Sequence, residues 1–228
     1  MPADDAIRYP IATVDAVILT IEDDQVKVLL HRRDRDPFKG DWALPGGFVH
    51  VDDDADAEAA MRRVLAEKVG TNGLYLEQLA TYSGPSRDPR GWSISITHLA
   101  LVPREVLEFE GQDADVQLAA LDALPDLAFD HARIIADARA RLVGKGSYST
   151  LPASFLPTEF TLGEMQKAYE TVLGTQIDQS SFRRKVGDLD LIEETGESRR
   201  DGRRRPAKLF RLREGIGTFD RTLATGLG

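Results

Sequence analysis

Residues 46–70 read GGFVHVDDDADAEAAMRRVLAEKVG and place a glycine pair, a run of aspartates and a helical segment next to one another. A glycine pair lets the backbone turn sharply. The composition of residues 57–69 predicts a helix, and Gly70 is a suitable residue to end it. The stretch therefore predicts a tight turn in front of a helix, with acidic side chains between them.

Segments with the composition of strands and helices surround this stretch. Runs rich in Val, Ile, Leu and Thr predict strands at 13–21, 25–33, 41–49, 75–83 and 92–102. The acidic residues 22–24 predict a hairpin turn between the first two strands, and Pro45-Gly46-Gly47 is expected to break the third. A second helix is predicted at 127–144, ending at Gly144. This order predicts an α/β fold of the α+β kind, in which helices flank one mixed sheet.

The distribution of charge divides the chain into two parts. Residues 1–154 carry 16 Lys and Arg against 26 Asp and Glu, whereas residues 155–228 carry 13 against 12. Near the same place, residues 144–157 are rich in Gly, Ser and Pro. A charge break of this kind indicates two domains with different partners. We expect one domain at 1–147 and a second at 148–228.

The second part has the pattern of a winged helix-turn-helix domain. Thr161 and Glu164 predict a capping box at the start of a first helix, which Gly174 ends. The predicted elements are helices at 160–174 and 178–191 and short β segments at 191–194 and 207–212. The two β segments bracket a loop rich in Gly and Arg.

The composition excludes several classes of protein. The chain has no cysteine, which excludes disulfides and thiolate metal sites. The polar, acidic start is unlike a secretory signal, and no apolar run approaches the roughly 20 residues that span a bilayer. We expect a cytoplasmic protein without a membrane partner.

The quoted stretch also bears on chemistry, because carboxylates three or four positions apart on a helix can bind divalent metals together. It resembles the Nudix box: a glycine, five residues, a glutamate, seven residues, then Arg-Glu-apolar-any-Glu-Glu-any-Gly. Counted back from Gly70, Arg63 and Glu67 match, but Val64 and Lys68 replace metal-binding glutamates. We therefore expect no catalytic residues, no required cofactor or metal, at most weak Mg²⁺ binding, and little or no hydrolysis. A purely structural helix, with Arg63 paired to Glu67, is an alternative.

Other segments indicate which group of Nudix proteins the chain resembles. PFKGDWALPGGFV (37–49), YLEQLATYSGPSRDPRGWSIS (75–95) and LAFDH (127–131) resemble the ADP-ribose-binding branch of Nudix proteins. FTLGEMQKAYETVLG, FRRKV and TGESRRDGRRRPAKLFRL resemble the winged helix of the Nudix-related transcriptional regulators of NAD metabolism. The resemblance implies a homodimeric repressor with ADP-ribose as its effector.

The resemblance also implies where the effector binds. Arginines near the former metal site would pair with phosphate oxygens, and aromatic rings would stack on adenine. The candidate ligand-binding residues are Trp42, Arg62, Arg63, Glu67, Tyr82, Arg87, Phe129 and His131. Core packing is the alternative for Trp42 and Phe129, a solvated charge for Arg87, and packing at a helix start for His131. Arg90, in the same loop as Arg87, is open to the same two interpretations, a ligand contact or a solvated charge.

The basic half supplies candidates for DNA binding, since Lys and Arg neutralise phosphates. Phe182 and Val186 are expected to pack the second helix onto its domain, leaving its other residues for the major groove. The candidates are Gln179, Ser180, Ser181, Arg183, Arg184 and Lys185 in this helix, and Arg199, Arg200, Arg203, Arg204, Arg205 and Lys208 around the loop. A homodimer would read palindromic operator DNA, and ADP-ribose would reorient the winged helices through 144–157.

Two alternatives stay open at this point. One is an active Nudix ADP-ribose pyrophosphatase with an accessory nucleic-acid-binding domain, in which Asp52 to Asp54 and Glu67 hold Mg²⁺. The other is a regulator that senses a different sugar phosphate.

Overall fold

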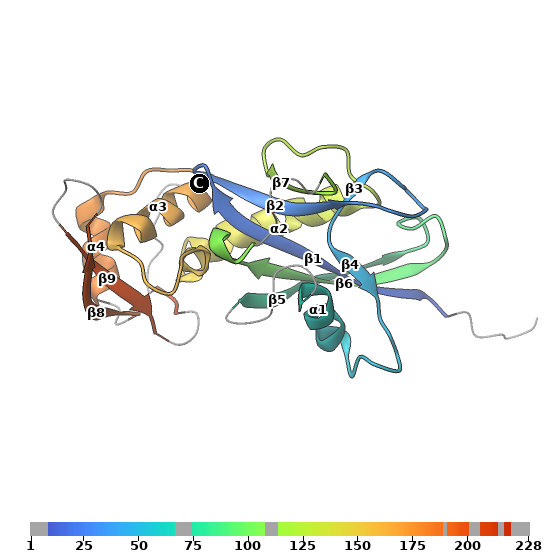
Figure 1. The fold of residues 1–228 in the computed structure, drawn as a ribbon, viewed down its shortest axis with the longest axis horizontal. Helices are drawn as coiled ribbons and strands as arrows, with labels where there is room; N and C mark the ends of the chain where they lie inside the picture. The colour runs from blue at the N-terminus through green and yellow to red at the C-terminus, as the bar shows by residue number, and fades with distance from the viewer. Residues whose placement is uncertain are drawn as a thin grey trace, which may run out of the picture.

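The computed structural model describes residues 9–66, 74–107, 114–188, 191–200, 206–213 and 217–219. The molecule is elongated, with a large sheet at one end and a small helical unit at the other (Figure 1). The helices are α1 (Ala57–Ala66), α2 (His131–Gly146), α3 (Leu162–Leu173) and α4 (Gln179–Asp188), with short 3-10 turns η1 (Arg104–Val106) and η2 (Leu151–Phe155). Within these described segments, none of the helices has the length and hydropathy of a membrane span.

The large sheet is mixed, as predicted. Its strands are β1 (Ile11–Glu22), β2 (Gln25–Arg32), β3 (Trp42–Ala43), β4 (Gly46–Phe48), β5 (Tyr75–Gly84), β6 (Ser93–Leu101) and β7 (Val116–Ala120). The central order is β3-β2-β1-β6-β5, with β4 also paired to β1 and β7 to β2. β1 runs parallel to β6 and antiparallel to β2. The predicted hairpin is confirmed, and its turn residues Asp23 and Asp24 have positive φ angles of 52° and 60°.

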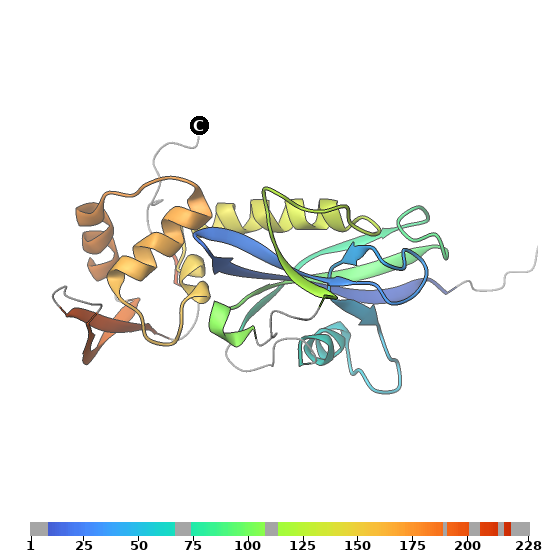
Figure 2. The ribbon, with the colours of Figure 1, turned by 45° about the horizontal axis from the view of Figure 1, so that its top comes forward.

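Alternate residues of β1 serve two separate cores. Val14, Ala16 and Ile18 pack in a cluster with Met61 and Leu65 of α1. Val17 and Leu19 belong to the other cluster, with Ile134 and Leu142 of α2. Figure 2 shows α1 and α2 on opposite faces of the sheet. The alternation follows from the two-residue period of a strand, and it fixes which β1 side chains point toward α2.

Both ends of the second helix differ from the prediction. The second helix starts at His131 rather than 127, because Leu127 bridges to Trp42 as an extended residue and Phe129 has a φ of 56°. It ends at Gly146, beyond the predicted Gly144. The predicted break in the third strand is confirmed, since Leu44 and Pro45 separate β3 from β4, but Gly46 and Gly47 pair with β1 in β4 and lie after the break. The predicted end of the first helix at Gly70 lies outside the described residues.

The helical unit at the other end is a winged helix. At the start of α3, Thr161 N–H donates to Glu164 Oε2 (2.8 Å) and Glu164 N–H donates to Thr161 Oγ1 (3.2 Å), so the capping box is confirmed. Gly174 ends α3 with a φ of 65°. The wing is a two-stranded sheet of β8 (Ile192–Arg199) and β9 (Ala207–Leu212), in which β8 is longer than predicted.

The segment between the two ends is packed rather than exposed. Ser149, Thr150 and Leu151 are each at most 2% exposed. Tyr169 of α3 donates its hydroxyl hydrogen bond to the carbonyl of Ser149 (2.8 Å). The hydrophobic cluster that contains Val17 also contains Tyr169, and it continues into α4. The division at 147 and 148 stays a prediction from composition, and a continuous core crosses it.

Candidate functional site

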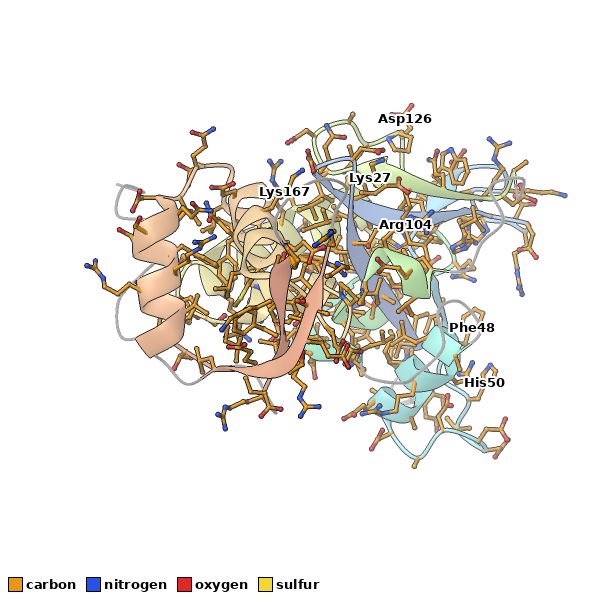
Figure 3. All side chains as sticks on the ribbon, turned by 60° about the vertical axis from the view of Figure 1, so that its left-hand side comes forward. Lys27, Phe48, His50, Arg104, Asp126 and Lys167 are labelled. Atoms are coloured by element: carbon orange, nitrogen blue, oxygen red, sulfur yellow. The ribbon has the colours of Figure 1, made fainter. Side chains whose placement is uncertain are left out.

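A pocket lies where β1, β4, the loop before β6 and the start of α2 meet. Exposed and half-buried side chains of Arg33, Arg35, Arg90 and Phe48 form its edge, and the lining reaches Asp15, Arg87 and His131, whose side chains are at most 11% exposed. Figure 3 shows Phe48 well away from Lys167 of α3. The pocket therefore belongs to the sheet end of the molecule.

Two carboxylates balance the buried guanidinium of Arg87. Its Nε and Nη2 donate to Asp130 at 3.1 and 2.8 Å, and Nη1 donates to Ser93 Oγ at 3.3 Å. Asp15 lies farther off, with Oδ2 at 3.9 Å from Arg87 Nη2. Losing one partner of such a buried pair leaves a charge uncompensated. Much of the charge of Arg87 is therefore already matched inside the protein.

His131 begins α2 and is fixed by the main chain. Leu44 N–H donates to its Nδ1 at 2.9 Å, so Nδ1 has to be the acceptor. Burial lowers the pKa of His131, and the carboxylates of Asp15 and Asp130 offset only part of this effect. The ring is therefore neutral at pH 7, with its hydrogen on Nε2.

Aromatic rings and arginines alternate around the pocket. Phe129 packs edge-on against Phe38 with ring centres 4.8 Å apart, and the Arg33 guanidinium lies 4.7 Å from its ring. Arg90 lies 5.1 Å from the Phe48 ring. The positive φ of Phe129 is uncommon for a large residue and directs its ring into this cluster. Flat rings beside guanidinium groups are suited to a ligand with both a base and phosphates.

The structure brings together only some of the predicted ligand residues. Arg87, Phe129 and His131 line the pocket. Arg63 lies behind its edge, where its side chain donates to the carbonyl of Phe48 (3.0 Å) and pairs with Asp54 (2.7 Å). That ion pair lowers the pKa of the Asp54 carboxyl to about 2.

The other predicted ligand residues do not line this pocket. Tyr82 is buried, and its hydroxyl donates to Asp137 at 2.8 Å. Trp42 packs against the core, with Arg32 at 5.0 Å from its ring. Arg62 is exposed and pairs with Glu58 along α1. Glu67 lies outside the described residues.

Sequence reasoning missed several pocket residues. They are Asp15, Arg33, Phe48 and Asp88, whereas Arg90, which was open to either reading, also lines the pocket. For Asp15 a signal was present, since it is a lone acid within the apolar run TVDAVILTI, at a position that alternation directs to a core. The others lie in turns or at strand ends, where no periodicity marks a side chain as facing a site.

The side chains of α1, the helix that resembles part of the Nudix box, pack it onto the sheet. Met61 and Leu65 are core residues, as the structural alternative required, and Val64 is 4% exposed. Val64 Cγ2 would lie 3.5 Å from a Cβ on Gly47, so it packs α1 against β4. Among the described residues, no group of three or more His, Asp or Glu side chains is arranged to hold a metal ion.

Helix α4 is amphipathic, with a buried apolar side and an exposed polar side. Phe182 and Val186 are at most 1% exposed, which confirms their predicted packing. Gln179, Ser180, Ser181, Arg183 and Arg184 are exposed, and Lys185 is half-buried 5.6 Å from the Phe219 ring. In the wing, Arg200 is exposed, Arg199 pairs with Glu164, and Lys208 pairs with Glu194. Arg203, Arg204 and Arg205 lie outside the described residues.

Comparison with known proteins fits both ends of the molecule. A family model for the NUDIX domain matches residues 12–138, and a model of the NrtR DNA-binding winged helix domain matches residues 152–212. The chain is 40% identical over 207 residues to the ADPR responsive transcriptional repressor NtrR of Acinetobacter baylyi, covering 89% of this chain and 82% of that protein. The chain belongs to the NrtR family of Nudix-related transcriptional regulators.

Solved structures of the NrtR family extend the likeness to three dimensions. Shewanella oneidensis NrtR in complex with a 27mer DNA has a TM-score of 0.86 at 40% identity, covering 93% of this chain and 99% of that chain. The Nudix domain of the same protein in complex with ADP ribose has a TM-score of 0.53 at 39% identity, covering 62% and 94%. An ADP-ribose pyrophosphatase of Methanocaldococcus jannaschii is 40% identical over 129 residues, which are 57% of this chain and 73% of that protein.

One prediction concerns the glycine pair of this NrtR-family chain. A Cβ on Gly46 would lie 2.3 Å from Asp15 Oδ1 and 2.7 Å from the carbonyl oxygen of Val14. Gly46→Ala is therefore expected to destabilise the protein by about 1–3 kcal/mol, because backbone has to move. The matched control is Gly47→Ala, whose Cβ meets only Val64 at 3.5 Å and is expected to be neutral or stabilising by up to about 1 kcal/mol. Urea denaturation measures both, and equal costs would contradict the prediction.

A second prediction concerns pH. Burial holds the pKa of His131 below its ordinary value of 6.5, so the unfolded chain takes up a proton that the folded chain does not. The stability that results is present above pH 6.5 and is lost as the pH falls below it. The free energy of unfolding is therefore expected to be lower at pH 5.5 than at pH 7.5. Measured by urea denaturation, His131→Asn should lose less stability than wild type between these two pH values, whereas His50→Gln, at an exposed position, should behave like wild type. An unchanged pH dependence in His131→Asn would refute the prediction.

Proposed function

We propose that this protein is a homodimeric repressor of NAD-biosynthesis and salvage genes, acting in the cytoplasm, that binds palindromic operator DNA and releases it when ADP-ribose binds the Nudix pocket. The observation that carries the proposal is the match over 93% of the chain to a relative that was crystallised with DNA. An exposed polar surface on α4 and an arginine-edged pocket on the sheet supply the two binding surfaces that this function needs.

The DNA-binding surface consists of the exposed side of α4 and the wing. Phe182 and Val186 hold the opposite side of α4 against the domain, so Arg183 and Arg184 point to solvent. Arginine pairs with phosphates and also reads guanine in the major groove. In a homodimer, two such helices about 34–36 Å apart would meet successive major grooves of a palindrome.

The ligand-binding surface is the pocket edge. Arg33, Arg35 and Arg90 line a common space, and Arg90 is also paired with Asp88 at 2.7 Å. Their guanidinium groups suit the two phosphates of ADP-ribose. Phe48 is 44% exposed beside Arg90 and offers a ring on which adenine can stack. Phe129 is the other ring in reach.

Helix α2 is the element that connects the two surfaces. It starts with His131 in the pocket and ends with Gly146, where an added Cβ would lie 3.1 Å from Pro152 of η2 and 3.1 Å from Val172 of α3. A ligand that shifts α2 would move α3, and with it α4. The segment 149–153 is buried and is not a loose tether, so we propose that the coupling runs through this rigid contact. The factor by which ADP-ribose lowers the DNA affinity then equals the ratio of its affinities for the two arrangements of α2 and α3.

We also propose that the chain hydrolyses ADP-ribose weakly or not at all. Val64 replaces a metal-binding glutamate of the Nudix box, and its side chain packs in the core. The likeness to the archaeal ADP-ribose pyrophosphatase supports the rival, an active hydrolase. Incubation of the protein with ADP-ribose and Mg²⁺, followed by chromatography, decides between them: formation of AMP and ribose 5-phosphate at an enzymatic rate would establish the hydrolase.

The regulatory proposal is tested by fluorescence anisotropy of DNA from upstream of the NAD-biosynthesis genes in the source genome. The salt concentration is held constant, since phosphate contacts make affinity fall steeply with salt. Tight binding that ADP-ribose relieves supports the proposal. Tight binding that ADP-ribose does not change would leave a regulator of another ligand, such as a different sugar phosphate, and the absence of specific binding would refute the repressor.

A further inference from the structure

A buried acid lies at the inner end of the pocket. Asp15 is 8% exposed and sits in β1, on the face directed at α2. Its Oδ2 accepts a hydrogen bond from Ser95 Oγ at 2.5 Å. The nearest cation, Arg87, is 3.9 Å away and is already held in two hydrogen bonds by Asp130. Among the described residues, Oδ1 of Asp15 accepts no hydrogen bond.

His131 faces this free oxygen. Its Nδ1 accepts from Leu44 N–H, which leaves Nε2 as the nitrogen that carries the hydrogen. Nε2 lies 3.9 Å from Asp15 Oδ1. That separation exceeds the roughly 3.2 Å limit of an N–H···O hydrogen bond. A donor and an acceptor therefore face one pocket without satisfying each other.

The pair has the chemistry to receive a hydroxyl group. One hydroxyl oxygen can accept from Nε2–H and donate to Oδ1 at the same time. A phosphate oxygen that is ionised cannot donate to Asp15, and an ammonium group cannot accept from His131. A nucleotide sugar carries hydroxyl groups within reach of its phosphates.

Gly46 keeps the approach to this pair open. Any Cβ at position 46 would lie 2.3 Å from Asp15 Oδ1, so a side chain there would cover the oxygen that the ligand has to reach. Gly46 and Gly47 both line the pocket. The glycine thus serves a close approach to the acid rather than a turn.

We infer that Asp15 and His131 together bind a ribose hydroxyl group of the effector and select sugar-bearing nucleotides over other polyanions. The inference rests on the proposed ligand site. It assigns opposite tasks to the two ends of the pocket: Arg33, Arg35 and Arg90 at the edge attract phosphates, while the buried acid disfavours an anion and favours the neutral sugar hydroxyl. By its charge alone, Asp15 weakens the binding of an anion, so its removal should tighten ADP-ribose binding. If its removal weakens ADP-ribose binding instead, Asp15 forms a hydrogen bond with the ligand.

The test is calorimetric titration of full-length wild type and Asp15→Asn with ADP-ribose, ADP and inorganic pyrophosphate. Asp15→Asn is expected to weaken ADP-ribose binding about 10-fold or more, the usual effect of losing a hydrogen bond to a charged group. Binding of pyrophosphate should stay equal or become tighter, because a negative charge is gone. Asp122→Asn removes the same charge from an exposed position outside the pocket lining and should not weaken ADP-ribose binding.

The ADP titration identifies the sugar. If Asp15→Asn weakens ADP as much as ADP-ribose, the hydroxyl group belongs to the adenosine ribose; if ADP behaves like pyrophosphate, it belongs to the terminal ribose. Equal ADP-ribose affinity in Asp15→Asn and wild type would overturn the inference, and so would equal weakening of all three ligands. Wild-type protein that binds none of the three would instead refute the ligand site itself.

Operator binding and the unfolding transition show whether Asp15→Asn is folded. If it is not, wild-type protein titrated with ADP-ribose analogues that lack single hydroxyl groups gives the same decision. A loss of about 10-fold for one analogue supports the inference, and no loss for any analogue overturns it.

Discussion

Replacing Arg183 and Arg184 together with alanine is expected to lower operator affinity at least about 100-fold without lowering stability. Both side chains are exposed on α4, opposite the buried Phe182 and Val186. A base contact by arginine contributes about 1–3 kcal/mol, and a phosphate contact adds about 0.9 to the slope of log affinity against log salt. Exposed substitutions change stability by only about 0.5 kcal/mol. Anisotropy at several salt concentrations measures both affinity and slope.

The matched control is Arg139→Ala. Arg139 is a half-exposed arginine on α2 that pairs with Asp122 at 2.7 Å, away from the winged helix. The substitution removes one positive charge from the protein but none from the proposed DNA-binding surface, so operator affinity should change little. If Arg183→Ala and Arg184→Ala had no more effect than Arg139→Ala, α4 would not be the recognition helix.

Phe182→Ala, on the other side of the same helix, is expected to cost about 3–5 kcal/mol of unfolding free energy. Phe182 is fully buried, and its ring centre lies 5.5 Å from that of Tyr169. Both belong to the cluster that continues to Val17 of the sheet, so we expect one unfolding transition for the whole chain rather than two. Urea denaturation followed by far-ultraviolet circular dichroism measures the cost.

Phe48→Ala is the control for Phe182→Ala, because it removes the same atoms from a ring that is 44% exposed. Its cost should be well below that of Phe182→Ala. Equal costs would mean that α4 is not held by this core, and a separate early transition in wild type would mean that the winged helix unfolds by itself.

Helix and strand elements with local causes were predictable from the sequence. The capping box of Thr161 and Glu164 acts within four residues, as does the turn after Glu22. Phe182 and Val186 are one helical turn apart, so their common burial follows from helix geometry. The start of α2 was not predictable in this way, because the bridge of Leu127 to Trp42 joins residues far apart in the chain.

The sequence by itself indicated two parts of different charge, a mixed sheet with flanking helices, a winged helix, and the residues that α4 exposes, apart from Lys185, which is half-buried. These follow from charge, periodicity, caps and the order of motifs, which can be read along the chain. Only the tertiary structure decided the pocket. Asp15 meets His131 and Arg87 meets Asp130 because parallel pairing of β1 with β6 and the packing of α2 place them together. Long-range pairing of this kind depends on how whole elements pack, and no local pattern in the sequence records it.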